Sequence, residues 1–361
     1  MRHRLLAVLT GLLPALVSAE PIRLATFNTE LERDGPGLML RDIERGNDPQ
    51  IRAVLEVIAA TKADILLLQG VDWDAEGRAL TALTAQIETH GLSYPYRYAP
   101  QPNRGLTTGL DMNGDGRTGG PEDSQGYGEF TGQGGMALLS RLPIEVAQAT
   151  NFSTLIWQDL PGATLPTVQG EPFPSDAAQK LQRLSTTGHW VVPIRTSEGS
   201  FCILAFQASP PVFDGPEDRN GLRNRDELRL WSLYLNGELD KMPCKRPVIM
   251  GGSNLDPWDS DGYSAEMRRL LDHPMLQDPT PESSGARDAP DQGHRNDNAT
   301  DTVDWPKVGR LRVDYILPSS DLDVIDTGVI WPSPKDDPLY KAALEASRHR
   351  LVWVDLQFPS H

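Results

Sequence analysis

One loop carries oxygen-bearing side chains at the spacing of a calcium site. Its first, third, fifth, sixth and twelfth positions are Asp111, Asn113, Asp115, Gly116 and Glu122. Oxygen ligands at this spacing wrap around Ca²⁺, and the glycine allows the sharp turn between them. Arg117, at the seventh position, would contribute its backbone carbonyl. The pattern predicts a Ca²⁺ ion that braces a long loop and takes no part in chemistry.

The flanks of this loop leave an alternative open. Gly105 and Gly109 precede it, and Pro121 and the polar stretch 124–128 follow it, so the paired helices of an EF-hand are not expected. The alternative is a polar, glycine-rich turn without a metal.

The N-terminus has the pattern of a secretory signal peptide. Basic residues precede an apolar run over 5–17, and small residues end it at Ala19. We expect residues 1–19 to be removed and residues 20–361 to form one secreted domain, periplasmic or extracellular. A buried helix or a membrane anchor is the alternative, but the run is too short for a membrane span and Pro14 interrupts it.

The two cysteines, Cys202 and Cys244, suit an oxidising compartment, in which a pair of thiols is readily joined. They lie in or just before two strand-like runs, 201–206 and 247–250. If those strands are neighbours, a disulfide is feasible; otherwise the cysteines are two separate buried thiols. The sequence leaves both possibilities open.

Charge and composition exclude several classes of protein. The 361 residues include 50 acidic and 34 basic side chains, for a formal net charge of −16. The mean hydropathy of −0.40 excludes a protein with several membrane spans. The negative charge disfavours nucleic acid and anionic membranes as partners unless a cation intervenes. The sequence names no partner.

Short apolar runs separated by polar loops indicate a layered α/β protein. Strand-like runs are found at residues 22–27, 63–68, 136–139, 190–194, 201–206, 248–250, 312–317 and 351–356. Between the first two runs, apolar residues over 51–58 fall on one helical face. The stretches 101–135 and 279–305 are rich in Gly, Pro, Asp and Asn, and we expect them to be loops that carry sites.

Six short blocks follow one another in a specific order. They are ATFN at 25–28, DILLLQGVD at 64–72, PPVFDGPEDRN at 210–220, GGSN at 251–254, RVDY at 312–315 and SRH at 347–349. The series resembles the endonuclease/exonuclease/phosphatase family, in its secreted bacterial branch, and covers nearly all of residues 22–357. The resemblance implies an α/β, four-layer α/β/β/α sandwich of two facing mixed sheets in a single domain. It also implies a metal-dependent phosphoester hydrolysis centre on the strand ends at one edge.

Four positions that carry catalytic groups in the family hold other residues here. The metal-binding glutamate of the second block is Gly70, and the histidine expected just before the third block is Gln207, which is always neutral. The aspartate that would activate water in the fourth block is Gly252. The acid of the last block is Arg348, a permanent cation. Phosphoester hydrolysis needs a cation, a base and donors that hold the developing charge, so three tasks lack their residue.

Other parts of the family pattern are present. Asn28 and Asn254 match its amide ligands, and His349 with Asp314 matches the pair in which the acid sets the imidazole tautomer. Without the resemblance, Asn28 would be a turn former at a strand end, Asp314 a satisfied structural carboxylate and His349 a surface or capping histidine.

Asp72 is a possible substitute ligand, because it lies two residues after Gly70 and therefore on the same face of a strand. Relocating one ligand is reasonable. Relocating a ligand, a base and a phosphate donor together is not, because a loosely held centre loses orders of magnitude in rate.

We therefore expect a secreted family member with an impaired centre that serves as a scaffold or binding protein. The alternative is an active hydrolase with a rebuilt centre, in which Asp72 and Asn28 hold Mg²⁺ or Mn²⁺ and His349 with Asp314 does the acid-base work. A third possibility is an anion receptor, in which Arg348 and the amides hold phosphate or carboxylate without cleaving it.

Overall fold

The computed structural model describes residues 20–239, 245–289, 291–333 and 337–359. The predicted signal peptide, residues 1–19, lies outside the described residues. Within them, none of the helices combines the length and the apolar character that crossing a membrane requires.

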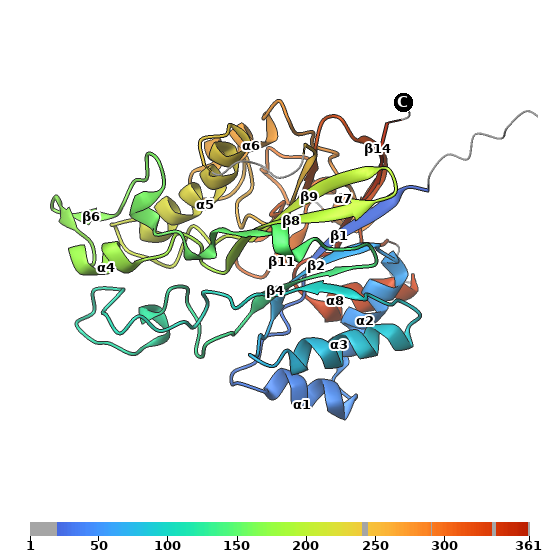
Figure 1. The fold of residues 1–361 in the computed structure, drawn as a ribbon, viewed down its shortest axis with the longest axis horizontal. Helices are drawn as coiled ribbons and strands as arrows, with labels where there is room; N and C mark the ends of the chain where they lie inside the picture. Colours follow the sequence, from blue (N-terminus) through green and yellow to red (C-terminus); the bar gives the residue numbers. More distant parts are fainter. Residues whose placement is uncertain (1–19, 240–244, 290, 334–336, 360–361) are drawn as a thin grey trace, which may run out of the picture.

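Two mixed sheets form the centre of the fold (Figure 1). The first has the order β14-β15-β1-β2-β4-β3 and the second β13-β10-β9-β8-β5. The strands of the first sheet are β1 (Ile22–Asn28), β2 (Ile65–Val71), β3 (Tyr96–Tyr98), β4 (Gly135–Ser140), β14 (Asp323–Val329) and β15 (Val352–Gln357). Those of the second are β5 (Thr150–Asn151), β8 (Gly188–Thr196), β9 (Gly199–Gln207), β10 (Pro247–Gly252) and β13 (Asp314–Pro318). Each sheet contains one parallel pair, β1 with β2 and β9 with β10.

Helices cover the outer faces of both sheets. The helices are α1 (Leu38–Arg45), α2 (Pro49–Thr61), α3 (Arg78–Thr89), α4 (Asp176–Leu181), α5 (Arg219–Leu235), α6 (Ser264–Leu271), α7 (Ser284–Asp288) and α8 (Pro338–Ala346). Two small sheets complete the structure: β6 (Thr167–Val168) with β7 (Glu171–Pro172), and β11 (Val303–Trp305) with β12 (Gly309–Leu311). Figure 1 shows α1, α2, α3 and α8 on one side of the paired sheets and α5 and α6 on the other.

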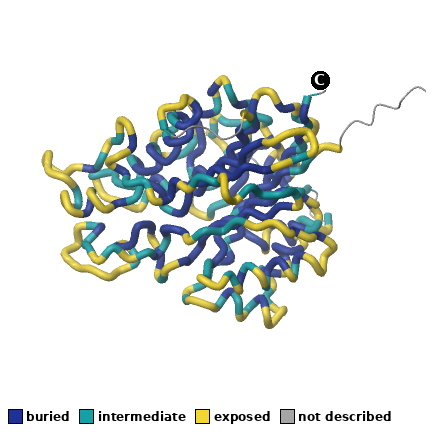
Figure 2. The backbone as a smooth tube through the Cα atoms, in the orientation of Figure 1, coloured by how far each residue is buried: buried dark blue, intermediate teal, exposed yellow. Residues whose placement is uncertain are grey.

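The alternation of side chains along β2 shows why the layers form. Leu66 and Leu68 pack into the cluster under α2 and α3, whereas Ile65 and Leu67 pack into the cluster between the two sheets. A strand buried on both faces must be apolar at consecutive positions, as this one is. A third cluster lies between the second sheet and α5, and it includes Trp231. Figure 2 shows these buried layers in the middle of the molecule. The predicted four-layer α/β/β/α sandwich is confirmed.

The predicted strand runs all contain strands, and the helix predicted over 51–58 is part of α2. Asp48 begins α2, because its side chain accepts a hydrogen bond from Ile51 N at 2.9 Å and Pro49 takes the first helical position. The stretch 279–305, expected to be a loop, also contains the short helix α7 and the strand β11.

The strands near the two cysteines are neighbours. Cys202 on β9 is fully buried and is opposite Pro247 of β10. Cys244 lies outside the described residues, so the disulfide stays a prediction.

The end of β10 depends on one glycine. Gly251 has φ +143°, and a Cβ there would lie 1.8 Å from the carbonyl oxygen of Phe206 on β9. Real side chains never come so close to backbone, so β9 and β10 can pair in this register only with glycine at this position.

We expect Gly251→Ala to lower the free energy of unfolding by about 3 kcal/mol or more, because strain and overlap add. Urea denaturation measures this loss. Gly46→Ala is the matched control, because Gly46 has φ +66° with nothing within 4 Å of its Cβ, and it should lose only about 1–2 kcal/mol. Equal losses in the two variants would contradict this account.

Candidate functional site

Residues of both sheets meet at one edge because each sheet contributes the carboxyl ends of a parallel pair. Parallel strands bring their carboxyl ends to the same edge. In the first sheet these ends carry Asn28 and Gly70, and in the second Gln207 and Gly252. Asp314, the first residue of the antiparallel strand β13, is paired with Gly252. The structure therefore brings together the residues that the resemblance assigns to one centre.

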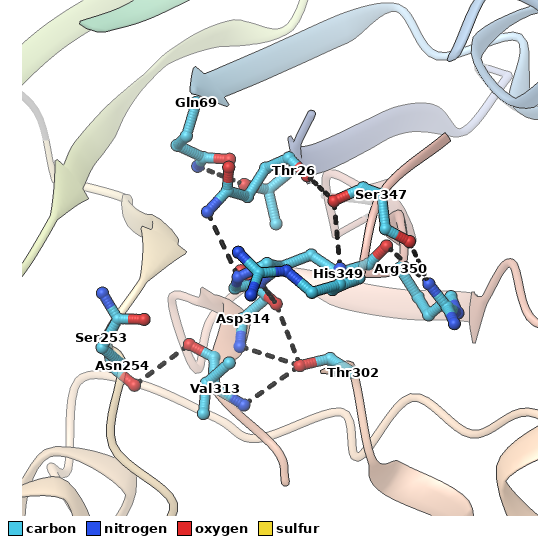
Figure 3. A network of polar contacts seen from close by, with 12 residues as sticks. Thr26, Gln69, Ser253, Asn254, Thr302, Val313, Asp314, Ser347, His349 and Arg350 are labelled. Atoms are coloured by element: carbon cyan, nitrogen blue, oxygen red, sulfur yellow. Dashed lines mark hydrogen bonds and ion pairs between the residues drawn. The ribbon is translucent and has the colours of Figure 1, made fainter. Parts of the chain in front are cut away.

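A buried hydrogen-bonded chain links the two sheets (Figure 3). His349 Nδ1 lies 2.8 Å from Asp314 Oδ2, and His349 Nε2 lies 3.3 Å from Asn28 Nδ2. Thr302 Oγ1 donates to Asp314 Oδ2 at 3.0 Å and accepts from the backbone N of both Val313 and Asp314. The carboxylate thus has a fixed position and holds the imidazole by one ring nitrogen.

The pKa of His349 is raised. Burial of the ring opposes its charged form, but the nearby charge of Asp314 and the hydrogen bond to that carboxylate outweigh burial. This His–Asp pair has the composition of an acid–base group. Proton transfer to a substrate would also require Nε2, which here faces Asn28.

The loop after β1 supplies a carboxylate that the sequence analysis missed. Glu30 accepts hydrogen bonds from Arg348 N and Arg348 Nε, each at 2.8 Å, and its carboxylate also pairs with Arg348 Nη2. Ser347 Oγ donates to Glu30 Oε2 at 3.0 Å and to Asn28 O at 2.8 Å. Burial opposes the charge of Glu30, but these contacts with Arg348 lower its pKa. Arg348 is therefore bound to an acid on the neighbouring loop.

Backbone and side chains close the space above Gly70. Gly70 has φ +66°, and a Cβ there would lie 2.7 Å from Asn28 Oδ1 and 2.8 Å from both Glu30 N and Glu32 Oε2. The left-handed backbone arises at the β-bulge between Gln69 and Val71. A glutamate at this position would be strained and would overlap its neighbours.

Glu32 is a second acid that the sequence analysis missed. Its Oε2 is buried and makes no hydrogen bond to any described residue. Its Oε1 lies 3.6 Å from Arg104 Nη1. Both missed acids lie in the loop that starts at Asn28, but only the folded loop shows that they reach the strand ends. Their closeness in sequence to Asn28 was the one available signal.

On the second sheet, Gln207 fills the space beside Gly252. A Cβ on Gly252 would lie 2.3 Å from Gln207 Oε1 and 3.0 Å from Gln207 Nε2. The two residues are opposite each other on β9 and β10. Gln207 Oε1 is buried without a hydrogen-bond partner among the described residues. The side chain expected for a base is absent, and a neutral amide takes its place.

Asp72, the predicted substitute ligand, is held by backbone amides. Its Oδ1 accepts from Gly134 N at 3.0 Å and its Oδ2 from Arg33 N at 3.1 Å. Burial raises its pKa to about 6, against the effect of these two hydrogen bonds, and the charge of Glu32 raises it further. Both oxygens therefore already brace the loops around β2.

Asn254 is also committed to backbone. Its Nδ2 donates to Ala208 O at 2.8 Å, and its φ is +51°. Beneath it, Asn224 Nδ2 donates to the carbonyls of Ser209 and Ser253, at 2.6 and 2.7 Å. This amide network connects the end of β9 with the end of β10.

Side chains of the predicted calcium loop accept hydrogen bonds from the backbone amides of the same loop. Asp111 accepts from Gly114 N and Gly116 N, at 2.6 and 2.8 Å, and Asn113 accepts from Asp115 N at 3.2 Å. Asp115 in turn accepts from Arg117 N at 2.8 Å. Glu122 Oε2 lies 3.0 Å from the position of a Cβ on Gly120. Calcium binding stays a prediction.

The residues at the strand ends do not fit the divalent metal that the resemblance implies. Position 70 has no side chain and no room for one, and Glu30 is already bound by Arg348. Throughout the described part of the chain, no group of three or more acidic, histidine or cysteine side chains is arranged to hold a metal ion.

Solved structures show the same fold. An endonuclease/exonuclease/phosphatase from Beutenbergia cavernae has a TM-score of 0.55 and 17% identity, with 95% of this chain and 72% of that chain covered. A family protein from Leptotrichia buccalis has a TM-score of 0.52 and 16% identity, with 93% and 100% covered. At such identities the likeness concerns the fold alone.

Among curated protein sequences, none matches this chain significantly. The sequence does match the model of the Endonuclease/Exonuclease/phosphatase family over residues 25–349. Because this match spans most of the chain, the protein belongs to the endonuclease/exonuclease/phosphatase family.

Proposed function

We propose that this protein is a secreted member of its family that does not hydrolyse phosphoesters and that functions as a binding protein or scaffold. The observation that carries the proposal is that neighbouring groups fill the space of two catalytic side chains. Asn28, Glu30 and Glu32 close the space above Gly70, and Gln207 fills the space beside Gly252. A centre with neither its metal carboxylate nor its base lacks the two groups that would activate water.

An active hydrolase with a rebuilt centre is the second candidate. The buried pair of His349 and Asp314, with Asn28 at the other ring nitrogen, favours it. The position of Asp72 does not, because both of its oxygens accept backbone amides. An anion receptor based on Arg348 is disfavoured for a similar reason, since Glu30 already neutralises that guanidinium.

The first test is turnover. We expect the purified protein to hydrolyse bis(p-nitrophenyl) phosphate, p-nitrophenyl phosphate and single-stranded DNA no faster than buffer, with Mg²⁺, Mn²⁺ or Ca²⁺ present. His349→Ala should leave this background unchanged. Turnover that depends on a divalent cation and disappears in His349→Ala would refute the proposal and support the rebuilt centre.

The second test is a double-mutant cycle on β9 and β10. We expect Gly252→Ala to destabilise the protein by about 1–2 kcal/mol, because the new Cβ overlaps the Gln207 amide. In a Gln207→Ala background the same change should cost about 1 kcal/mol less. Urea denaturation of the four proteins measures the coupling energy. Additive effects would show that Gln207 does not occupy this space.

The matched comparison is at Gly70. Here the positive φ and the backbone N of Glu30 oppose any side chain, so we expect Gly70→Ala to cost about 2–3 kcal/mol. Removing the flexible neighbour in Gly70→Ala/Glu32→Ala should restore little of this stability. Full rescue by Glu32→Ala would mean that the backbone is not the obstacle.

We also propose that the loop from Asp111 to Glu122 binds Ca²⁺. The spacing of the oxygen-bearing side chains in this loop supports the proposal. Both oxygens of Asp111 accept loop amides, so the ion would have to use their remaining lone pairs. One millimolar Ca²⁺ is at least about one hundred times the Kd of a sensor-like site (~10⁻⁷–10⁻⁵ M), so it should raise the melting temperature by several degrees. Asp115→Ala should abolish the increase, and an unchanged wild-type melting temperature would refute calcium binding.

A further inference from the structure

An arginine lies where this family has an acid beside its metal, and the surrounding contacts show what it binds. Arg348 donates from its backbone N and from Nε to Glu30, and its guanidinium forms an ion pair with the same carboxylate. Ser347 connects that carboxylate to Asn28, because its hydroxyl donates to Glu30 Oε2 and to Asn28 O. The Arg348 guanidinium is thus linked through Glu30 and Ser347 to the backbone carbonyl of Asn28, whose side-chain amide matches a metal ligand of the family.

Oxygen atoms with negative or partial negative charge gather at this edge. Asn28 Oδ1 and Glu32 Oε2 lie 2.7 and 2.8 Å from the position that a Cβ added to Gly70 would occupy. Glu32 Oε2 has no hydrogen-bond donor among the described residues. Glu30 N lies 3.4 Å from Asn28 Oδ1, so the Glu30 loop folds back over the same position. Such a cluster of acceptors needs a positive charge nearby.

Arginine side chains supply that charge. Arg348 is paired with Glu30, and the charge of Glu32 also stabilises the Arg348 cation. Arg104 Nη1 lies 3.6 Å from Glu32 Oε1. A guanidinium bound to a carboxylate through more than one hydrogen bond neutralises it without any metal.

We propose that the Arg348 guanidinium replaces the divalent cation of this family: it neutralises Glu30 beside Asn28 and thereby prevents metal binding by Asn28, Glu30 and Glu32. The inference rests on the proposed function in one respect, namely that the wild-type chain uses no catalytic metal. It adds two points. Glu30 and Glu32, the two acids after Asn28, still offer oxygen ligands for a metal. The Arg348 guanidinium blocks these ligands.

The proposal predicts that removing the guanidinium creates a metal site. In Arg348→Gln, we expect Mn²⁺ to bind at least tenfold more tightly than in the wild-type protein, measured by electron paramagnetic resonance titration. Mn²⁺ should also raise the melting temperature of this variant more than that of the wild type. Arg348→Lys, which keeps a cation, should behave like the wild type. Because the Arg348 side chain is 58% exposed, these variants are expected to fold.

Two further variants control for general charge effects. Arg195→Gln removes an exposed arginine that is paired with Glu145 at 3.2 Å, so it leaves one isolated carboxylate and should gain no Mn²⁺ binding. Arg348→Gln/Glu30→Gln should lose the gain, because Glu30 would be a ligand. Any Mn²⁺ bound by the loop at Asp111 is common to all variants and cancels in the comparison.

Three outcomes would overturn the proposal: no gain of Mn²⁺ binding in Arg348→Gln, an equal gain in Arg195→Gln, or a gain that survives Glu30→Gln. None of them bears on hydrolysis, so the absence of turnover would still stand. Conversely, cation-dependent turnover by the wild-type protein would refute the proposed function whatever Arg348→Gln binds.

Discussion

The apolar layer between the two sheets is the constraint on which the rest of the structure depends. Residues such as Leu67 of β2 and Met250 of β10 share this buried cluster, so the two parallel pairs cannot slide relative to one another without exposing it. Strand ends from both sheets are therefore held at one edge, whatever residues they carry. This explains how the polar chain from Asp314 through His349 to Asn28 can lie at that edge whichever residues surround it.

With the backbone fixed, the residues at the strand ends must suit one another locally. The bulge at Gly70 leaves a left-handed residue whose side-chain space is taken by the Glu30 backbone and the Glu32 carboxylate. At Gly252, only the end of the flexible Gln207 side chain intervenes. The two glycines are thus physically different: backbone closes the first position, whereas a single amide covers the second. Restoring side chains would meet unequal resistance in the two sheets.

The sequence was sufficient to predict the layers and the meeting of the strand ends, because the apolar runs are strong and the order of the blocks is specific. It could not show the contacts made by the loops. The two-residue spacing between position 70 and Asp72 predicts that both lie on one face of a strand. In the structure, however, the Asp72 oxygens accept hydrogen bonds from the backbone amides of Arg33 and Gly134. Glu30 and Glu32 attract no attention as isolated acids, since their importance arises from a turn with φ +49° at Glu30. Such contacts depend on loop backbone, which side-chain patterns do not encode.

Charge links these local facts to function. Phosphoester chemistry in this family would require a cation that can exchange ligands with a substrate oxygen. A guanidinium cannot do so: it only donates hydrogen bonds, and Nε and Nη2 of Arg348 are directed at Glu30. If Arg348 balances the charge at this edge, as proposed, no metal is needed there for that purpose, and the same ion pair occupies the guanidinium that could bind a phosphate. An edge at which Glu30 is paired with Arg348 inside an intact sandwich is consistent with the proposed scaffold role.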